Sequence, residues 1–369
     1  MSSHRTGAAD SENCIGLVRL VLSYAVIISH SYELLDGNRN REPLSRVLHG
    51  LSLGDVAVLF FFVVSGYLVT GSYVNTSTAS GYIAKRILRI YPGYLAAFII
   101  CLIVVGPVAS DIDLREWPGL LVLNAKRLAL LQAPELPGVF SGSYYPALNG
   151  SMWTISYEFR CYLLVLLFGA VGAFNRGHWV AAFTLVLLVA TTLNLHSIDE
   201  VIVLKLRGIS AVFGDIEQTI QLTAAFCCGM CMYIYFEKIG IIRYWHVYVI
   251  FSLVCMLVFL SQASTEVIGV SVFAGYVVLT IAFNTKNALL CSIGRSVDLS
   301  YGVYLYAWPI QKVVILFAPG IDVIVHILAA IVGSSIVAWF SWRLVEQPFL
   351  KLKTKANARV REAPPSASE

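Results

Sequence analysis

The sequence predicts an all-α membrane protein, a polytopic bundle of about ten transmembrane helices with both termini in the cytoplasm. Of its 369 residues, 58% are hydrophobic and only 13% are charged, whereas a soluble domain carries about 25% charged residues. Apolar runs recur along the chain, and a run of about 20 apolar residues crosses a bilayer as a helix. The short alternating segments typical of a transmembrane barrel are not apparent.

We expect ten spans, and the stretch GLLVLNAKRLALL at 119–131 is a candidate for an eleventh, interfacial helix. The spans are expected at about 15–32, 51–73, 91–109, 151–173, 178–195, 217–236, 244–262, 266–284, 298–318 and 322–344.

The distribution of basic residues predicts the orientation. With cytoplasmic termini, the inner segment 74–90 carries three basic residues and no acid, and the inner segment 345–369 is also basic. The outer loops 110–150 and 196–216 mix both signs, and they are where an extracytoplasmic partner would be met. Because cytoplasmic loops carry an excess of Lys and Arg, this pattern favours both termini inside.

We therefore expect a short cytoplasmic segment at 1–14, an integral membrane domain at 15–346 and a basic cytoplasmic tail at 347–369. The net charge of +4 comes from loops and tail, so membrane lipid is the expected partner and nucleic acid is not. Most cysteines lie inside apolar runs, where they are typical of small buried hydrophobes. Cys228 and Cys231 have zinc-like spacing but no second pair, so we expect no metal.

The first span, IGLVRLVLSYAVIISHSYE, carries a polar stripe. Eleven residues turn a helix by about 1100°, about 20° from a whole number of turns, so Arg19, Ser23, Ile27 and His30 share one face over about 16 Å. Arg19 is expected near the cytoplasmic face and His30 near the outer face. The alternatives are that Arg19 reaches lipid phosphate and that His30 caps the helix end.

Two acids are expected near the level of His30. Asp55 opens the second span at its outer end, where it would balance the imidazole charge or stand as an interfacial acid in water. Glu158 opens the fourth span, in MWTISYEFRCYLL, and shares a face with Tyr162 four residues on. An intramembrane acid beside a histidine is a pairing that can run acid–base chemistry.

A cationic cluster and a tyrosine-rich segment complete the candidates. Lys85, Arg86 and Arg89 fall on one predicted helix that Pro92 should end. They would bind a phosphorylated cytoplasmic donor, or serve as an ordinary positive-inside anchor. The segment SYGVYLYAWPIQ contains Tyr301; its tyrosines would line a polar cavity or simply pack.

These residues together resemble the acyltransferase-3 family of bacterial integral membrane O-acyltransferases. The resemblance covers about residues 12–350. It rests on Arg19 and His30 in the first span and on FFFVVSGYLV, KRILRIYPGY, MWTISYEFRCYLL, SYGVYLYAWPIQ and VEQPF, in that order. Two positions depart from the family pattern: Phe159 stands in place of a second acid, and Ala307 in place of a histidine.

The resemblance implies a bacterial inner-membrane enzyme that transfers an acyl group, most simply acetyl, from cytoplasmic acetyl-CoA to a sugar hydroxyl. The acceptor would be an exopolysaccharide, an O-antigen or another glycan or glycolipid, with polysaccharide export machinery as a further partner.

On this hypothesis Lys85, Arg86 and Arg89 bind the phosphates of the donor, and its arm lies beside Arg19 and Ser23. His30 is the general base or a transient acyl carrier, and Glu158 orients His30 or holds the acceptor. Acceptor contacts are expected from three side chains: Asp55, Tyr162 and Tyr301.

Two other functions fit part of the pattern. A secondary transporter or flippase for a sugar or lipid would also have many spans and buried polar groups. It would be expected to show discontinuous helices in symmetric halves, and the sequence has no such pairing. A structural or regulatory membrane protein would leave the ordered set of Arg19, His30, Lys85–Arg89 and Glu158 unexplained.

Overall fold

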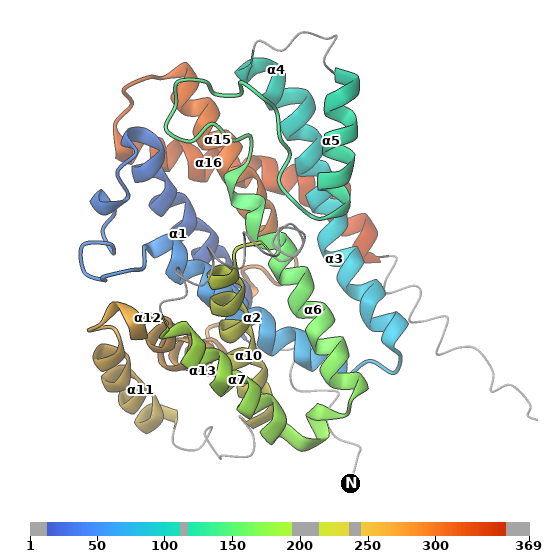
Figure 1. Cartoon of the computed structure of the whole chain (residues 1–369), viewed down its shortest axis with the longest axis vertical. Helices are drawn as coiled ribbons and strands as arrows, with labels where there is room; N and C mark the ends of the chain where they lie inside the picture. Colours follow the sequence, from blue (N-terminus) through green and yellow to red (C-terminus); the bar gives the residue numbers. More distant parts are fainter. Residues whose placement is uncertain (1–12, 111–116, 194–213, 236–244, 352–369) are drawn as a thin grey trace, which may run out of the picture.

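The computed structural model describes residues 13–110, 117–193, 214–235 and 245–351 (Figure 1). All regular structure in these residues is helical, which confirms the all-α class. Six stretches are long and apolar enough to cross a membrane: Ile15–Asp36, Leu53–Val74, Ala79–Ala109, Ala173–Thr191, Ala263–Asn284 and Val323–Lys351. The chain therefore has the character of a membrane protein, whereas ten spans and cytoplasmic termini stay predictions.

Most predicted spans coincide with observed helices. The longer ones are α1 (Ile15–Asp36), α2 (Leu53–Val74), α3 (Ala79–Ile100), α6 (Ile155–Ala170), α7 (Gly177–Thr191), α10 (Ile216–Tyr235), α11 (Trp245–Phe259), α15 (Ser300–Phe317) and α16 (Val323–Ser341). The short α12 (Glu266–Ile268), π-turn η7 (Gly269–Ala274) and α13 (Gly275–Asn284) follow one another without a break, and α14 (Ala288–Ser292) comes next. The candidate at 119–131 is the helix α5 (Trp117–Ala129).

Pro92 does not end the helix before it, contrary to the sequence prediction. α3 runs through Pro92 to Ile100 and continues as the π-turn η2 (Cys101–Val105) and α4 (Gly106–Ala109). Proline removes one backbone donor, but neighbouring helices in a membrane bundle can hold such a helix together. Pro92 is itself buried. The basic residues of the 74–90 segment therefore belong to the same helix as the third span.

The ends of the predicted domain lie partly outside the described residues. Of the segment 1–14, residues 1–12 are not described, and of the tail 347–369, residues 352–369 are not described. The five residues 347–351 are helical and continue the last helix, and the domain bounds stay predictions.

Close helix approach sets the centre of the bundle. A Cβ on Gly66 of α2 would lie 1.9 Å from the carbonyl oxygen of Phe226 in α10. In the same way, a Cβ on Gly229 of α10 would lie 2.0 Å from the carbonyl oxygen of Val63 in α2. Small residues let membrane helices pack backbone to backbone, and Gly66 and Gly229 serve this role here.

α6 begins inside the bundle rather than at its surface. The short 3-10 turn η4 (Gly150–Thr154) leads into it, and Leu148, Asn149, Ser151 and Met152 around the start of that turn are at most 1% exposed. Asn149 donates from its side chain to the carbonyl of Leu305 in α15 at 2.7 Å, which fixes the incoming chain against that helix. The first turn of α6 is consequently preceded by chain enclosed within the protein, not by chain at the surface of the bundle.

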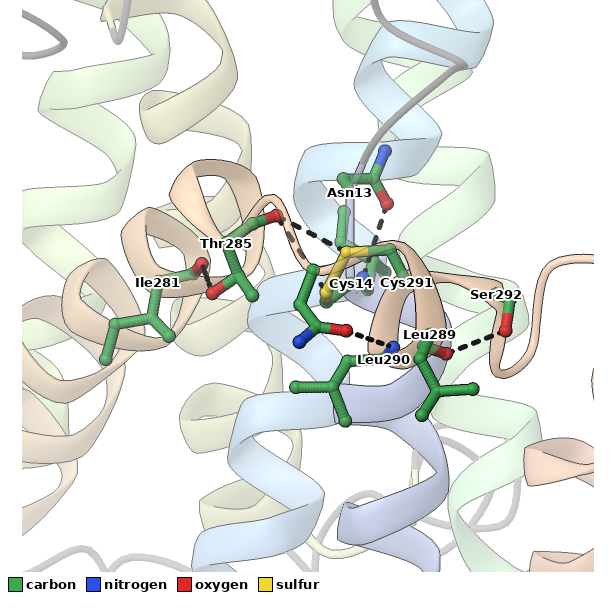
Figure 2. Close-up of a disulfide and its surroundings, with 10 residues drawn as sticks. Asn13, Cys14, Ile281, Thr285, Leu289, Leu290, Cys291 and Ser292 are labelled. Atoms are coloured by element: carbon green, nitrogen blue, oxygen red, sulfur yellow. Dashed lines mark hydrogen bonds between the residues drawn. A yellow bond between two sulfur atoms is a disulfide. The ribbon is translucent and has the colours of Figure 1, made fainter.

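A disulfide joins the start of α1 to α14 (Figure 2). It links Cys14 to Cys291 across a sequence separation of 277 residues. The backbone N–H of Cys14 also donates to the carbonyl of Ala282 at 2.9 Å. The other six cysteines are free and are buried or half-buried, in line with the sequence prediction; the bonded pair was not anticipated.

We predict that the disulfide adds measurably to thermal stability. A cross-link between distant positions is worth about 2–4 kcal/mol, or roughly 3–5 °C in unfolding temperature for a chain of this size. In detergent without reductant, the double variant Cys14→Ser/Cys291→Ser should unfold earlier than wild type by this margin. With a strong reductant the two proteins should unfold together. Equal unfolding temperatures without reductant would show that the bond contributes nothing.

Candidate active site

A deep cavity opens among α2, α3, α6 and α15, with Arg19 of α1 at its wall. Its empty volume, including the part open to solvent, is about 1200 Å³. One wall follows α2 from Val58 to Val69, and eleven residues of helix measure about 16 Å. Leu350, near the end of the last span, also lines it. The cavity therefore extends about 16 Å along α2.

One end of the cavity is strongly cationic. Arg19 and Arg89 both donate to Oδ2 of Asp298, at 2.6 and 2.7 Å. The other Asp298 oxygen accepts from the hydroxyl of Ser300 at 2.6 Å. This half-buried carboxylate explains how two guanidiniums from different helices lie together, since like charges at this spacing would otherwise repel.

Two further cations at this end have only hydroxyls as hydrogen-bond partners in the described residues. Lys85 donates to Thr76 Oγ1 at 2.8 Å and Arg86 to Ser72 Oγ at 3.1 Å, and neither meets a carboxylate within the described residues. The Nε of Arg86 is buried with no hydrogen-bond partner. A buried charged donor without a partner is costly. This end of the cavity consequently has positive charge available for an anionic ligand.

Glu158 faces the middle of the cavity. Its Oε1 accepts from the hydroxyl of Tyr162 at 2.5 Å and from that of Ser65 at 3.1 Å. Glu158 and Tyr162 thus share a face of α6, as their spacing predicted. Its Oε2 has no hydrogen-bond partner in the described part of the chain and is not among the fully buried atoms. The guanidinium of Arg86 lies 5.5 Å from the centre of the Tyr162 ring, so Glu158 belongs with the cations.

His30 lies elsewhere, at the other end of α1. Its Nδ1 is 3.2 Å from Oε1 of Glu33, and its ring meets Trp308 of α15 edge-on at 5.0 Å. The second Glu33 oxygen accepts from Nε of Arg39 at 2.7 Å. Arg39 in turn lies 3.8 Å from Asp55. His30 therefore lies at one end of a chain of polar contacts that runs through Glu33 and Arg39 to Asp55, toward the segment between α1 and α2.

Arg39 stays charged in this chain. Burial alone would lower the pKa of its guanidinium, but the carboxylates of Asp55 and Glu33 outweigh burial and raise that pKa. A permanent cation on Glu33 favours the ionised carboxylate, which can only accept hydrogen bonds.

α15 connects the two groups of residues. Ser300, Tyr301 and Tyr304 line the cavity, and Trp308 is one turn further, about 6 Å along the helix. Tyr304 lies in the cavity wall, one turn before the Trp308 that contacts His30. Its hydroxyl shares a hydrogen bond with that of Thr154 at 2.7 Å, and its ring packs on Phe61. His30 does not line the cavity.

The predicted site residues separate accordingly. Seven line the cavity: Arg19, Lys85, Arg86, Arg89, Glu158, Tyr162 and Tyr301. Ser23 does not; it is fully buried, and its hydroxyl donates to the carbonyl of Leu20. Asp55 belongs to the His30 group. The predicted stripe of α1 does face one neighbour, because Arg19, Ile27 and His30 contact Asp298, Gln311 and Trp308 respectively.

The structure does not bring Glu158 to His30. Glu158 bonds Ser65 in the middle of α2, not the end of α2 that carries Asp55. The cause is the enclosed start of α6, which the span boundaries had placed at the membrane surface. Glu33, three residues from His30 on the same helix face, takes the place expected for Glu158.

Sequence reasoning overlooked three residues of the site. Asp298, at the start of a predicted span, carries the signal of an intramembrane acid. Glu33 was detectable as an acid three residues after a histidine on one helix. Ser65 carried no signal beyond a small residue beside Gly66.

We predict that Asp298→Asn destabilises the protein by about 3 kcal/mol, because removing one partner of a buried ionic group leaves the others uncompensated. Asp322→Asn is the matched control, since Asp322 caps α16 through the N–H groups of Ile324 and Val325 and asparagine caps equally well. Thermal unfolding followed by tryptophan fluorescence measures both. Identical unfolding of Asp298→Asn and wild type would contradict a structural role for the ion cluster.

Comparison with known proteins decides the family. Residues 12–343 match the family model described as an acyltransferase domain. The chain belongs to the acyltransferase-3 family. This acyltransferase is 29% identical over 359 residues to an O-acetyl transferase of Shigella phage Sf6, with 92% of this chain and 96% of the relative covered. No solved structure matches it.

Two further relatives differ in how much of the chain they match. Nodulation protein 10 of Rhizobium leguminosarum bv. viciae is 26% identical, with 94% of this chain and 95% of the relative covered. Acyltransferase MdmB of Streptomyces mycarofaciens is 30% identical over 121 residues only, 32% of this chain and 29% of that one. The resemblance drawn from the sequence is confirmed, and the protein is an acyltransferase enzyme rather than a transporter or a structural protein.

Proposed function

We propose that this acyltransferase moves an acetyl group from cytoplasmic acetyl-CoA, across a bacterial inner membrane, to a sugar hydroxyl of a surface or secreted glycan. The single observation that carries the proposal is a cavity that has cations without a carboxylate partner in the described residues at one end, and Tyr304 in its wall, one helical turn from the Trp308 that contacts His30. Likeness to an O-acetyl transferase supports acetyl as the acyl group.

The cationic end suits the nucleotide half of the donor. Lys85 and Arg86 have no carboxylate partner in the described residues, and phosphate oxygens are strong acceptors for such donors. The pantetheine arm then extends along the wall of about 16 Å formed by α2. Its amide N–H groups would donate to the open Oε2 of Glu158, so Glu158 holds the donor arm in this scheme instead of orienting His30.

His30 acts as the general base. Ionised Glu33 can only accept, so the proton of the neutral imidazole is on Nδ1 and the lone pair is on Nε2. Nε2 takes the proton of the acceptor hydroxyl while the hydroxyl oxygen attacks the thioester carbonyl carbon. The C–S bond breaks, and the proton passes from Nε2 to the departing thiolate of coenzyme A. The acyl group must first pass the Thr154–Tyr304 pair in the cavity wall.

Orientation follows from the position of the donor. The end with Lys85 and Arg86 faces the cytoplasm in this scheme, and the His30 group faces outward, in line with the positive-inside rule. Cys14 and Cys291 then lie on the cytoplasmic side, where thiols are kept reduced. We therefore expect the disulfide to form on isolation, not in growing cells.

Charge removal at the cavity mouth tests the donor site. Lys85→Ala and Arg86→Ala should each raise the KM for acetyl-CoA about tenfold, the loss of one charge-assisted hydrogen bond. The kcat at saturating donor should change little. Lys126→Ala is the control, because Lys126 is an exposed lysine of α5 away from the cavity. An unchanged KM for acetyl-CoA in both cavity variants would reject this cavity as the donor site.

A further inference from the structure

A second, smaller hollow lies in the segment between α1 and α2. This cup, as we call it, is lined by residues 39, 40, 45, 48–52 and 55, and its empty volume is about 330 Å³ including the part open to solvent. The enclosed part of that space is about 100 Å³, which is smaller than an ordinary ligand pocket. The cup can therefore hold one ring of a small polar molecule against its floor while the rest of the molecule stays in solvent.

Two buried carboxylates hold the cup in shape. Glu42, 0% exposed, accepts from the backbone N–H and hydroxyl of Ser45 and from the N–H of Leu53. Glu266 of α12, also 0% exposed, accepts from the N–H groups of His49 and Gly50. Loop backbone is usually tied by water or weak turns. Here the charge-assisted bonds to Glu42 and Glu266 preorganise it.

The free groups of the cup suit a neutral polyhydroxyl ligand. Oδ1 of Asp55 has no partner in the described residues, since its bonds use Oδ2. The side-chain amide of Asn40 is exposed, as is the His49 ring, whose Nδ1 faces Glu266. Arg39 is shared between Asp55 and Glu33, and the buried carboxylates of Glu42 and Glu266 add further negative charge, so the surroundings disfavour an anion such as an isolated phosphate. Donors and acceptors around one apolar patch of Leu48 and Leu51 match the hydroxyls and C–H face of a sugar ring.

The cup is connected to His30 but separate from it. Arg39 lines the cup and bonds Glu33, which bonds His30. Neither Glu33 nor His30 lines the cup. The side chains of Arg39 and Glu33 lie between a sugar ring in the cup and the imidazole of His30. Only a second ring, joined to the first, could reach the imidazole.

We propose that the cup is a subsite for the sugar next to the one that is acylated, so the enzyme selects an oligosaccharide or polymer over a single sugar. This proposal rests on the proposed function, and it specifies in addition that the acceptor contains at least two joined sugars. Asn40 and His49 are specificity residues that bind the neighbouring ring.

The test uses the full-length protein in detergent, acetyl-CoA, and size-separated fragments of the O-acetylated glycan of the host, from one sugar to several repeats. Asn40→Ala and His49→Ala should each raise the KM for the oligosaccharides about tenfold. They should leave unchanged the KM for acetyl-CoA, the kcat at saturating acceptor and the weak acylation of single sugars. Arg41→Ala is the control, because Arg41 pairs with Asp36 and does not line the cup.

Equal effects of both variants on single sugars and oligosaccharides, or no effect on either, would overturn the subsite. A wild-type enzyme that acylates single sugars as well as oligosaccharides would overturn it too. Failure of the proposed function looks different: the wild type would then acylate no fragment of any size.

Discussion

His30→Ala should reduce acetyl transfer by about 1,000-fold, within the range that general-base catalysis contributes. The methyl side chain leaves no atom that can take the acceptor proton. Binding of acetyl-CoA should be unchanged, because His30 lies outside the donor cavity. Both quantities can be measured on purified protein, as thiol release in the presence of acceptor and as donor affinity by calorimetry.

The same variant can be tested in cells through the O-acetyl signals of purified surface glycans by NMR. His178→Ala serves as control, since His178 is an exposed histidine of α7. Wild-type acetylation by His30→Ala at equal protein level in the membrane would remove His30 from the mechanism.

Glu33→Gln should reduce kcat by about 100-fold or more, because the amide keeps the shape but not the charge of the carboxylate. Glutamine can donate to Nδ1 and so favours the tautomer with its proton on Nε2, which cannot act as a base. Replacing the carboxylate that orients a catalytic histidine is costly in other enzymes for the same reason. Glu33→Asp, which retains the acceptor, should recover part of the rate.

Glu158→Gln is the matched comparison for this effect. Glu158 contacts Ser65 and Tyr162 in the donor cavity and has no contact with His30. Its loss should therefore act mainly on the KM for acetyl-CoA, while Glu33→Gln acts on kcat. The reverse pattern, with Glu158→Gln lowering kcat and Glu33→Gln silent, would restore the pairing expected from the sequence.

The sequence predicted angular position around a helix better than depth in the bundle. The spacing of Arg19, Ile27 and His30 correctly placed them on one face of α1, because helix periodicity depends on that segment alone. The depth of Glu158 depends on where α6 begins, and that is set by contacts such as Asn149 to Leu305 between distant segments. The residue pattern of one segment contains no information about contacts with distant segments.

Tertiary packing also decided two other departures. Pro92 has the local chemistry of a helix end, but α3 passes through it. The Cys14–Cys291 bond joins residues whose sequence separation of 277 hides their proximity. By contrast, the family motifs were detectable in order along the chain, since they depend on residue identity and not on packing.

The central claim is that donor and acceptor meet from opposite sides of the membrane, and sealed vesicles test it most directly. Inside-out vesicles containing this acyltransferase, with acceptor oligosaccharide in the lumen, receive radiolabelled acetyl-CoA on the outside. We predict labelled oligosaccharide in the lumen, none with His30→Ala, and none when right-side-out vesicles receive the same external donor. Labelling only when donor and acceptor share one side of the membrane would contradict transfer through the cavity.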